Sequence, residues 1–289
     1  IRHLDGLCGP LRGEGFKDRC HVLQAQTQWK AQTGADQLMV TGIKVYGATD
    51  VGRTRTSNED CHAALVGDGC PAGIDALLIV ADGLGGHAAG EVASRMAVDG
   101  MVRKLEERED YLMSLEGGAL DAALGQMLEE VSGEVYAAGQ FSPNRGMGTT
   151  CTVAAIRSGQ LYLAHIGDSR AYLLREGDLR QLTTDHSWVE EAVVSGILTR
   201  DAARSHPDRH VVTRAVGLDP EVVADKGMLS LMDGDLLLLC SDGLNSMVTD
   251  AGIAGLSLIT VPDQVCATLI DAANESGGHD NVTVVVAAL

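Results

Sequence analysis

Short apolar runs alternate with polar turns along most of the chain, and three longer stretches carry apolar residues at helical spacing. In 88–108, Ala93, Met96 and Ala97 lie on one face and charged residues close the segment, as in an amphipathic helix. Helices are predicted at 88–108, 118–138 and 262–275. Strands are predicted at 43–49, 61–66, 75–82, 149–156, 160–167, 170–175, 179–183, 211–216, 222–231, 235–243 and 281–289.

Tight turns join most of these strands. Ser158-Gly159 separates one pair and Glu176-Gly177-Asp178 separates the next, and turns this short force the strands that they join to pair antiparallel. A parallel sheet needs a helix between successive strands, which most of these strands lack. The pattern therefore predicts an α+β fold, a central antiparallel β-sandwich flanked by α-helices on both sides in four layers (αββα).

Residues 1–42 show no sustained hydrophobic period. We interpret them as an N-terminal extension, partly disordered or foreign to the natural protein. One domain is predicted at 43–289. Because only 3% of the residues are aromatic and 45% are hydrophobic, its core must be built from Val, Leu, Ile, Ala and Met.

The formal net charge of -18 argues against a nucleic-acid partner, which needs a basic face. The acidity favours either general solubility or clusters of acids that hold cations. The seven cysteines contain no C-x-x-C pair, which predicts buried free thiols in a reducing cytosol. No apolar run approaches the ~18 residues of a membrane helix. We therefore expect a cytoplasmic monomer without nucleic-acid or membrane partners.

The stretch "LLIVADGLGGHAAGEVAS" (77–94) contains G-x-G-x-x-A, the fingerprint of a dinucleotide-binding turn. That fold needs a parallel sheet and an acid at the end of the next strand, ~20 residues further on. At that distance this chain is still in its predicted helix. The alternative is that Asp82, directly before the first glycine, holds a metal.

Acidic residues stand at four predicted strand ends: Glu59, Asp82, Asp242 and Asp280. Any one of them fits a turn or a helix cap. If all four converge, their repulsion raises their pKa values, and divalent cations relieve it. Carboxylate oxygens select Mg²⁺ or Mn²⁺, and two such ions lower the pKa of a shared water enough to make it a nucleophile for phosphoester hydrolysis.

Six segments in this order resemble the motif series of the metal-dependent protein Ser/Thr phosphatases of type 2C (PPM), most closely the bacterial single-domain members. They are "TDVGRTRTSNED", "VADGLGGHAAGEVAS", "GMGTTCTVAAI", "LAHIGDSRAYL", "LLLLCSDGL" and "GHDNVTVVV". The series spans 43–289. The resemblance implies an antiparallel β-sandwich flanked by helices, in agreement with the pattern of turns.

The resemblance also implies a ligand set for two Mn²⁺ or Mg²⁺ ions. The matching positions are Glu59, Asp82, the Gly83 carbonyl, Asp242 and Asp280. Asp82 matches the ligand that bridges both metals, and Asp168 matches the ligand of a third, weaker metal in bacterial members. Asp60 matches the acid that steadies metal-bound water, and Asn281 matches the partner of the last aspartate.

Three further positions are implied near the reacting phosphate. Arg55 matches the phosphate-binding arginine by its spacing from Glu59, with Arg53 as a competing candidate. His87 either protonates the leaving alkoxide or caps a helix. Residues 186–216 match the flap of bacterial members and are expected to gate the site or to select substrates.

The implied activity is Mn/Mg-dependent hydrolysis of phosphoserine and phosphothreonine in proteins, including a cognate Ser/Thr kinase or its substrates. Two alternatives remain. One is a catalytically inactive relative that serves as a binding module, although such a chain should lack metal ligands. The other is a phosphatase that acts on a small phosphoester.

Overall fold

The computed structural model describes residues 42–85, 88–115, 119–258 and 261–289. The predicted extension 1–42 therefore lies outside the described residues except for Gly42, and His87 lies outside them as well.

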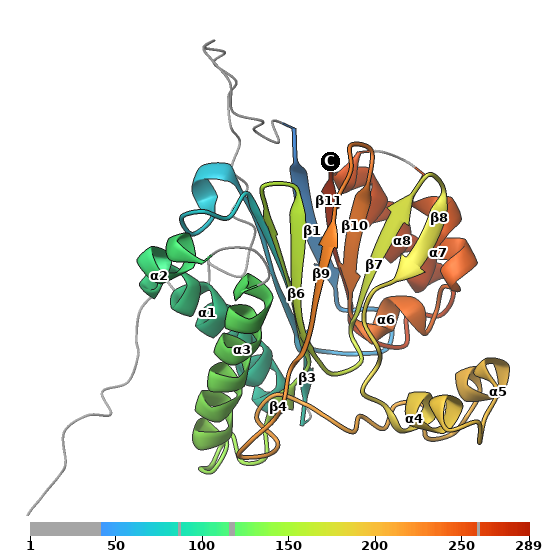
Figure 1. The fold of residues 1–289 in the computed structure, drawn as a ribbon. Helices are drawn as coiled ribbons and strands as arrows, with labels where there is room; N and C mark the ends of the chain where they lie inside the picture. Colours follow the sequence, from blue (N-terminus) through green and yellow to red (C-terminus); the bar gives the residue numbers. More distant parts are fainter. Residues whose placement is uncertain (1–41, 86–87, 116–118, 259–260) are drawn as a thin grey trace, which may run out of the picture.

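Two antiparallel sheets form the centre of the fold, as predicted (Figure 1). The five-stranded sheet runs β1 (Lys44–Asp50), β11 (Val282–Ala288), β10 (Leu236–Cys240), β7 (Arg170–Arg175) and β8 (Asp178–Gln181). The six-stranded sheet runs β2 (Asp60–Val66), β3 (Ala76–Leu84), β5 (Cys151–Arg157), β6 (Gln160–Ile166) and β9 (Asp225–Ser230), with β4 (Gly148–Thr149) paired to the end of β3.

Helices cover the outer face of each sheet, which confirms the sandwich with helical layers outside (Figure 1). The layer on β3 and β6 contains α1 (Ala88–Glu107), α2 (Glu109–Ser114) and α3 (Ala119–Ala138). The layer on β1 and β11 contains α6 (Asp242–Asn245), α7 (Asp250–Leu256) and α8 (Pro262–Glu275). Two short helices, α4 (Trp188–Val194) and α5 (Arg200–Arg204), lie beyond one end of the sheets.

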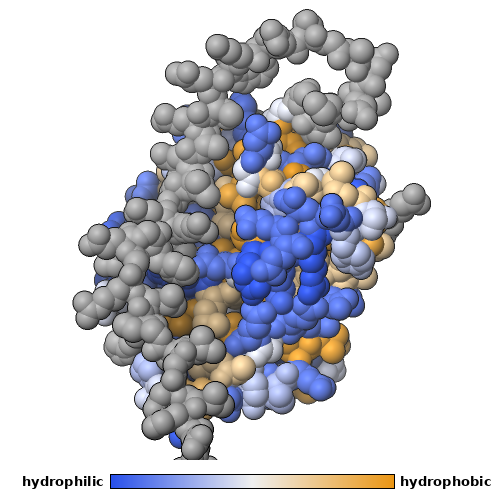
Figure 2. Space-filling view, turned by 90° about the vertical axis from the view of Figure 1, so that its left-hand side faces the viewer, coloured by the Kyte–Doolittle hydropathy of each residue, from blue (hydrophilic) through white to orange (hydrophobic). Residues whose placement is uncertain are grey.

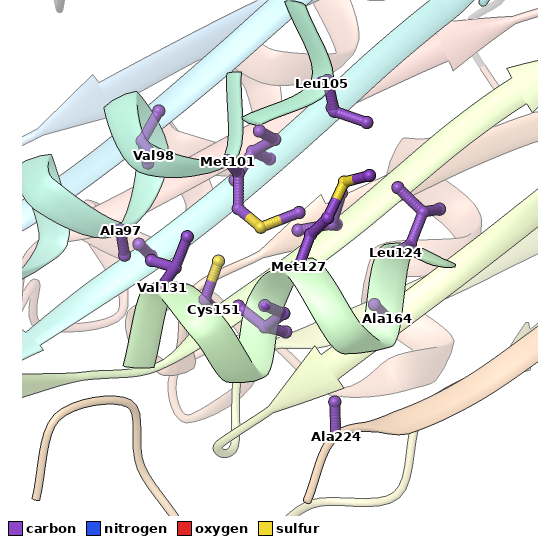
Figure 3. Packing of buried hydrophobic residues seen from close by; sticks show 14 of the residues in the cluster. Ala97, Val98, Met101, Leu105, Leu124, Met127, Val131, Cys151, Ala164 and Ala224 are labelled. Carbon is purple, nitrogen blue, oxygen red and sulfur yellow. The ribbon is translucent and has the colours of Figure 1, made fainter. Parts of the chain in front are cut away.

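Alternation along the strands divides the apolar residues among three cores. In β3, Leu77 and Ile79 face α1 and α3, whereas Leu78 and Val80 face the other sheet. A third core lies between the five-stranded sheet and α8. Figure 3 shows Met101 of α1 and Met127 of α3 meeting beside Cys151, so methionine and small residues fill space that aromatic rings fill in other proteins.

The outer surfaces of α1 and α3 are joined by ion pairs. Lys104 reaches Glu130 at 3.0 Å and Glu134 at 2.8 Å, and Arg108 reaches Glu130 at 2.6 Å. Figure 2 shows this side of the molecule, where hydrophilic residues form a continuous area. The charged end of the predicted helix 88–108 is therefore a contact between two helices as well as a solvated surface.

One predicted strand, 211–216, is wrong. Its first half pairs with the chain near Ser187, where the Thr213 N–H donates to the His186 carbonyl at 2.8 Å. Its second half pairs with Thr149 through Val216. Because the segment divides its backbone hydrogen bonds between two partners, no continuous ladder forms.

The described cysteines agree with the prediction of buried free thiols, and the described helices agree with the length and polarity of the apolar runs. Five cysteines are free, and four of them are buried. Burial raises the pKa of Cys151 to about 12, so this thiol is an inert core group. Within the described ranges, no helix combines the length and the apolar character that a bilayer span requires.

Candidate functional site

The acids predicted at strand ends come together at one end of the sandwich. Asp60 opens β2 and stands opposite Asp82 near the end of β3. Asp242 follows β10, and Asp280 precedes β11. Since each acid stands where a strand begins or ends, the chain can place charges here without putting them into the cores.

Asn281 ties the loop before β2 to the start of β11. Its Oδ1 accepts from the Glu59 N–H at 2.8 Å, and its Nδ2 donates to the carbonyls of Val51 and Ser57. Its own N–H donates to Asp280 Oδ1 at 2.8 Å. Asn281 thus contacts the last aspartate through its backbone and holds Glu59 in place through its side chain.

Two glycines bring Glu59, β3 and α1 into contact. A Cβ on Gly83 would collide with the carbonyls of Gly90 and Glu59, and a Cβ on Gly90 would collide with the Glu59 carboxylate. The Gly83 N–H donates to the Glu59 carbonyl at 3.1 Å. Only glycine at both positions allows this approach.

The backbone of Asp82 is fixed by the start of β5. Its N–H donates to Thr150 Oγ1 at 2.9 Å, and its carbonyl accepts from Thr149 Oγ1 at 2.8 Å and from the Thr150 N–H at 2.9 Å. Because the backbone groups are satisfied in this way, the carboxylate of Asp82 has a defined position among the other acids.

The acids repel one another strongly. Burial raises the pKa of Asp82 well above its ordinary value, and the charges of Asp60 and Asp242 raise it further. Burial and the charges of Asp242 and Asp185 likewise raise the pKa of Asp168. Divalent cations bound among these acids would relieve this repulsion.

Asp60 has one satisfied and one unsatisfied oxygen. Oδ2 accepts from Ser241 at 2.8 Å and from Thr283 at 2.6 Å, whereas the buried Oδ1 has no hydrogen-bond partner. A buried acceptor without a partner is costly, so it needs a water or an ion beside it. Burial outweighs the two hydroxyl hydrogen bonds and raises the pKa of Asp60 to about 7.

These groups fit hydrated Mg²⁺ or Mn²⁺. In the part of the chain that the structure describes, no three His, Cys, Asp or Glu side chains form a ready-made cage for a single ion. Hard divalent ions do not require one, since Mg²⁺ is usually held by one or two carboxylates and keeps several waters. The unsatisfied oxygen of Asp60 and the repulsion at Asp82 match such an ion and its waters.

Arg55 reaches the acidic centre. Arg55 Nη2 lies 2.8 Å from Asp280 Oδ2, and its guanidinium also interacts electrostatically with Glu59 and Asp82. Its side chain is 47% exposed, so a phosphate from solvent can approach it. The backbone N–H of Arg53 donates to the Gly278 carbonyl at 2.7 Å, as part of a turn.

Asp168 stands in the turn between β6 and β7 and is buried. A pocket of ≈180 Å³ is lined by Asp168, Asp242 and residues of 186–216, which we call the flap segment. His210 of this segment has its Nδ1 3.7 Å from Asp242 Oδ2. The structure thus places the predicted flap against the acidic centre.

The sequence reasoning missed several supporting residues. Ser241 and Thr283 hold Asp60, Thr150 holds Asp82, and Asp185 adds charge beside Asp168. Ser241 directly precedes Asp242 and Thr283 is two residues after Asn281, so closeness to the motif acids was an available signal. No local signal identified Asp185, because it lies in the loop after β8 and its partner Arg170 is 15 residues earlier, at the start of β7.

In the metal-free protein, the raised pKa values predict that stability falls as the pH rises. The folded protein holds protons on Asp60 more tightly than the unfolded chain does, so this contribution is complete below about pH 4 and is lost as the pH rises through about 7. Between pH 5 and pH 8 the loss is expected to be about 3 kcal/mol. Urea unfolding with EDTA at pH 5 and pH 8 measures it. The Asp60→Asn protein should show a shallower decline, and an equal decline in both proteins would contradict the assignment.

Comparison with known proteins identifies the family to which the chain belongs. A family model described as "Protein phosphatase 2C" matches residues 51–269. The protein phosphatase PhpP of Streptococcus pneumoniae (strain D39) is 38% identical over 243 residues, which are 83% of this chain and 95% of the relative.

Two solved structures share the fold. The S. agalactiae serine/threonine phosphatase has a TM-score of 0.78 at 34% identity, covering 86% of this chain and 99% of that chain. The catalytic domain of the serine/threonine protein phosphatase PstP, in complex with two manganese ions, has a TM-score of 0.70 at 37% identity, covering 85% of this chain and 97% of that chain.

The sandwich and its relatives define a hydrolytic enzyme of the phosphatase class. The chain belongs to the protein phosphatase 2C family.

Proposed function

We propose that this protein hydrolyses phosphoserine and phosphothreonine in proteins and depends on Mn²⁺ or Mg²⁺. The observation that carries the proposal is the convergence of acids from separate strand ends, where burial and mutual repulsion raise the pKa of Asp82 and of Asp168. The relatives named as protein phosphatases, and the two manganese ions in the PstP structure, support it.

We propose as metal ligands the same residues that the resemblance to the family implies. Two ions would be held by Glu59, Asp82, the Gly83 carbonyl, Asp242 and Asp280, with Asp82 shared, and a third, weaker ion by Asp168. When bound, the ions supply a water of lowered pKa as nucleophile and neutralise charge on the phosphate. Asn281 keeps Glu59 and Asp280 in register for this purpose.

The other residues bind the phosphate and move protons. Arg55 would release Asp280 to the cations and use its fork to hold two phosphate oxygens, because bidentate charge-assisted bonds fit a guanidinium. Asp60 would orient the attacking water through Oδ1, which has no protein partner. For His87 we propose proton donation to the leaving alkoxide, since an imidazole suits that role near neutral pH.

The rival functions are less well supported. An inactive binding module has no reason to retain Arg55 together with the whole set of acids at one end of the sandwich. A small phosphoester would not need the flap segment, which lines the pocket beside Asp168 and Asp242. We therefore favour phosphoproteins as substrates, among them a cognate Ser/Thr kinase or its targets.

The free, buried cysteines support a reducing compartment, and we propose a cytoplasmic monomer.

Hydrolysis of a phosphothreonine peptide tests the function. With Mn²⁺, release of phosphate is expected, and EDTA should reduce the rate at least about a hundredfold, because no protein nucleophile replaces the activated water. Restoring Mn²⁺ should restore the rate, which excludes damage by the chelator. If EDTA leaves the rate unchanged, the proposal that hydrolysis depends on a metal is refuted.

A further inference from the structure

The flap pocket joins the acidic centre to a group of arginines. Asp168 and Asp242 line it from the sandwich, and the flap segment contributes the positively charged residues Arg200, Arg204 and Arg209. In Figure 1, α4 and α5 lie apart from the helices that cover the sheets, beyond the end where the acids gather. A peptide whose phosphate lies at the acids therefore passes these arginines.

Two of the pocket's arginines already have acidic partners. Arg170 makes three hydrogen bonds to Asp185, and Arg200 lies 3.4 Å from Glu190. Both guanidinium groups already contact carboxylates, so an incoming anion would have to compete with those contacts.

Arg204 and Arg209 differ from them. Both are exposed, and among the residues that the structure describes neither forms an ion pair with an acid. Arg209 donates only to the His206 carbonyl, at 3.4 Å. Two guanidinium groups that form no ion pair thus line the same pocket as Asp168 and Asp242.

The charge of the flap segment contrasts with that of the whole chain. Residues 186–216 contain four arginines and four acids and are formally neutral, whereas the chain carries -18. The protein as a whole repels an acidic substrate. Positively charged side chains next to the site therefore decide which anionic segments of a substrate can bind.

The flap segment is also anchored, so its arginines have a defined place. The Trp188 N–H donates to the Val211 carbonyl at 2.9 Å, and the Gly167 N–H donates to His186 Nδ1 at 3.0 Å. The rings of Trp188 and His206 lie 4.8 Å apart, between α4 and the turn that carries Arg209. The first residue of the segment is thus tied to the turn that carries Asp168, and the other two contacts hold the segment together.

We propose that the flap pocket binds a second anionic group of the substrate, close in sequence to the phosphorylated residue, and that Arg204 and Arg209 are the residues that recognise it. The group is a carboxylate of Asp or Glu or a second phosphoryl group, which a guanidinium fork binds in the same way. This inference rests on the proposed phosphatase function and specifies which phosphoproteins are preferred. A pocket of ≈180 Å³ accommodates one such side chain.

Three peptides of equal length test the proposal, and each has a central phosphothreonine. The first has neutral neighbours, the second has glutamates at the neighbouring positions, and the third has a second phosphothreonine. The readout is the ratio of kcat/KM for an anionic peptide to kcat/KM for the neutral one, measured with Mn²⁺. In the wild type this ratio is expected to be about ten, and to fall at high salt because these side chains are exposed.

The Arg204→Gln/Arg209→Gln protein is expected to lose the preference, with a ratio near one. Arg204→Lys/Arg209→Lys should keep part of it, since the charge stays and the fork is lost. Arg180→Gln is the matched control: Arg180 is exposed on β8 and does not line the pocket, so the ratio should stay at the wild-type value.

The outcomes distinguish a failure of the proposed anion recognition from a failure of the proposed phosphatase activity. If the wild type hydrolyses all three peptides with equal kcat/KM, or if the double glutamine variant keeps the preference, the inference is overturned while the phosphatase function stands. A preference for only one anionic peptide identifies the carboxylate or the second phosphate as the ligand. If neither the peptides nor p-nitrophenyl phosphate are hydrolysed with Mn²⁺, the proposed function fails and the inference fails with it.

Discussion

Replacing Asp82 by Asn is expected to abolish activity and, at the same time, to make the metal-free protein more stable. Asn keeps the shape of the side chain and removes its charge. Activity should fall at least about a thousandfold, because the proposed shared ligand of both cations is lost. Without metal, the same change removes a charge that Asp60 and Asp242 repel, so the free energy of unfolding should rise by about 1–3 kcal/mol.

Two measurements check this pair of effects. Phosphate release from a phosphothreonine peptide with Mn²⁺ gives the activity, and urea unfolding in EDTA at pH 7.5 gives the stability. Asp271→Asn is the control, since this acid is exposed on α8 and should change neither quantity. An active Asp82→Asn protein would remove Asp82 from the site. A metal-free variant less stable than the wild type would show that the carboxylate is structural.

Replacing Arg170 by Met is expected to have the largest effect on stability. Arg170 donates three hydrogen bonds to Asp185, and its Nη1 donates to the Tyr172 hydroxyl at 2.9 Å. The side chains of Arg170 and Asp185 are only 17% and 10% exposed. Removing one partner leaves the charge of Asp185 buried beside Asp168, which should cost about 3–5 kcal/mol.

A double replacement shows whether the buried charge is the cause. Arg170→Met with Asp185→Leu should recover much of the loss, since apolar pairs of similar volume can replace a buried ion pair. Urea unfolding with EDTA measures all three proteins. If Arg170→Met loses less than about 1 kcal/mol, the pair contributes no more than a surface salt bridge. If the double variant is no better than the single one, packing rather than charge explains the loss.

The fold could be predicted because its main signals are local. Alternation along "ALLIVA" assigns Leu77 and Leu78 to opposite faces of β3, and short turns impose antiparallel pairing. The acids Glu59, Asp82, Asp242 and Asp280 were identifiable because charge at the end of an apolar run is unusual. The resemblance to the phosphatase family then gave each acid a proposed role.

Other features depend on contacts between distant segments. The strand predicted at 211–216 had suitable residues, but its hydrogen bonds are divided between two partners. The side chain of Asn281 holds the backbone of Glu59, 222 residues away in sequence, and no spacing rule predicts such a bond. The structure places the Arg55 guanidinium on Asp280, 225 residues away in sequence, whereas its role in binding phosphate stays a prediction. His87 and residues 1–41 lie outside the described residues, so the predictions for them stay predictions.

The position of β11 in the five-stranded sheet affects the order in which the protein folds during synthesis. β11 lies between β1 and β10, and Asp50 of β1 pairs with Val282 of β11. A nascent chain that has emerged through β6 already carries Glu59 and Asp82, but it lacks Asp242, Asp280 and the inner strand of the first sheet. Long-range pairing of this kind is slow to form. The acidic centre is therefore assembled last, and cations held there would stabilise the completed sandwich and not its precursors.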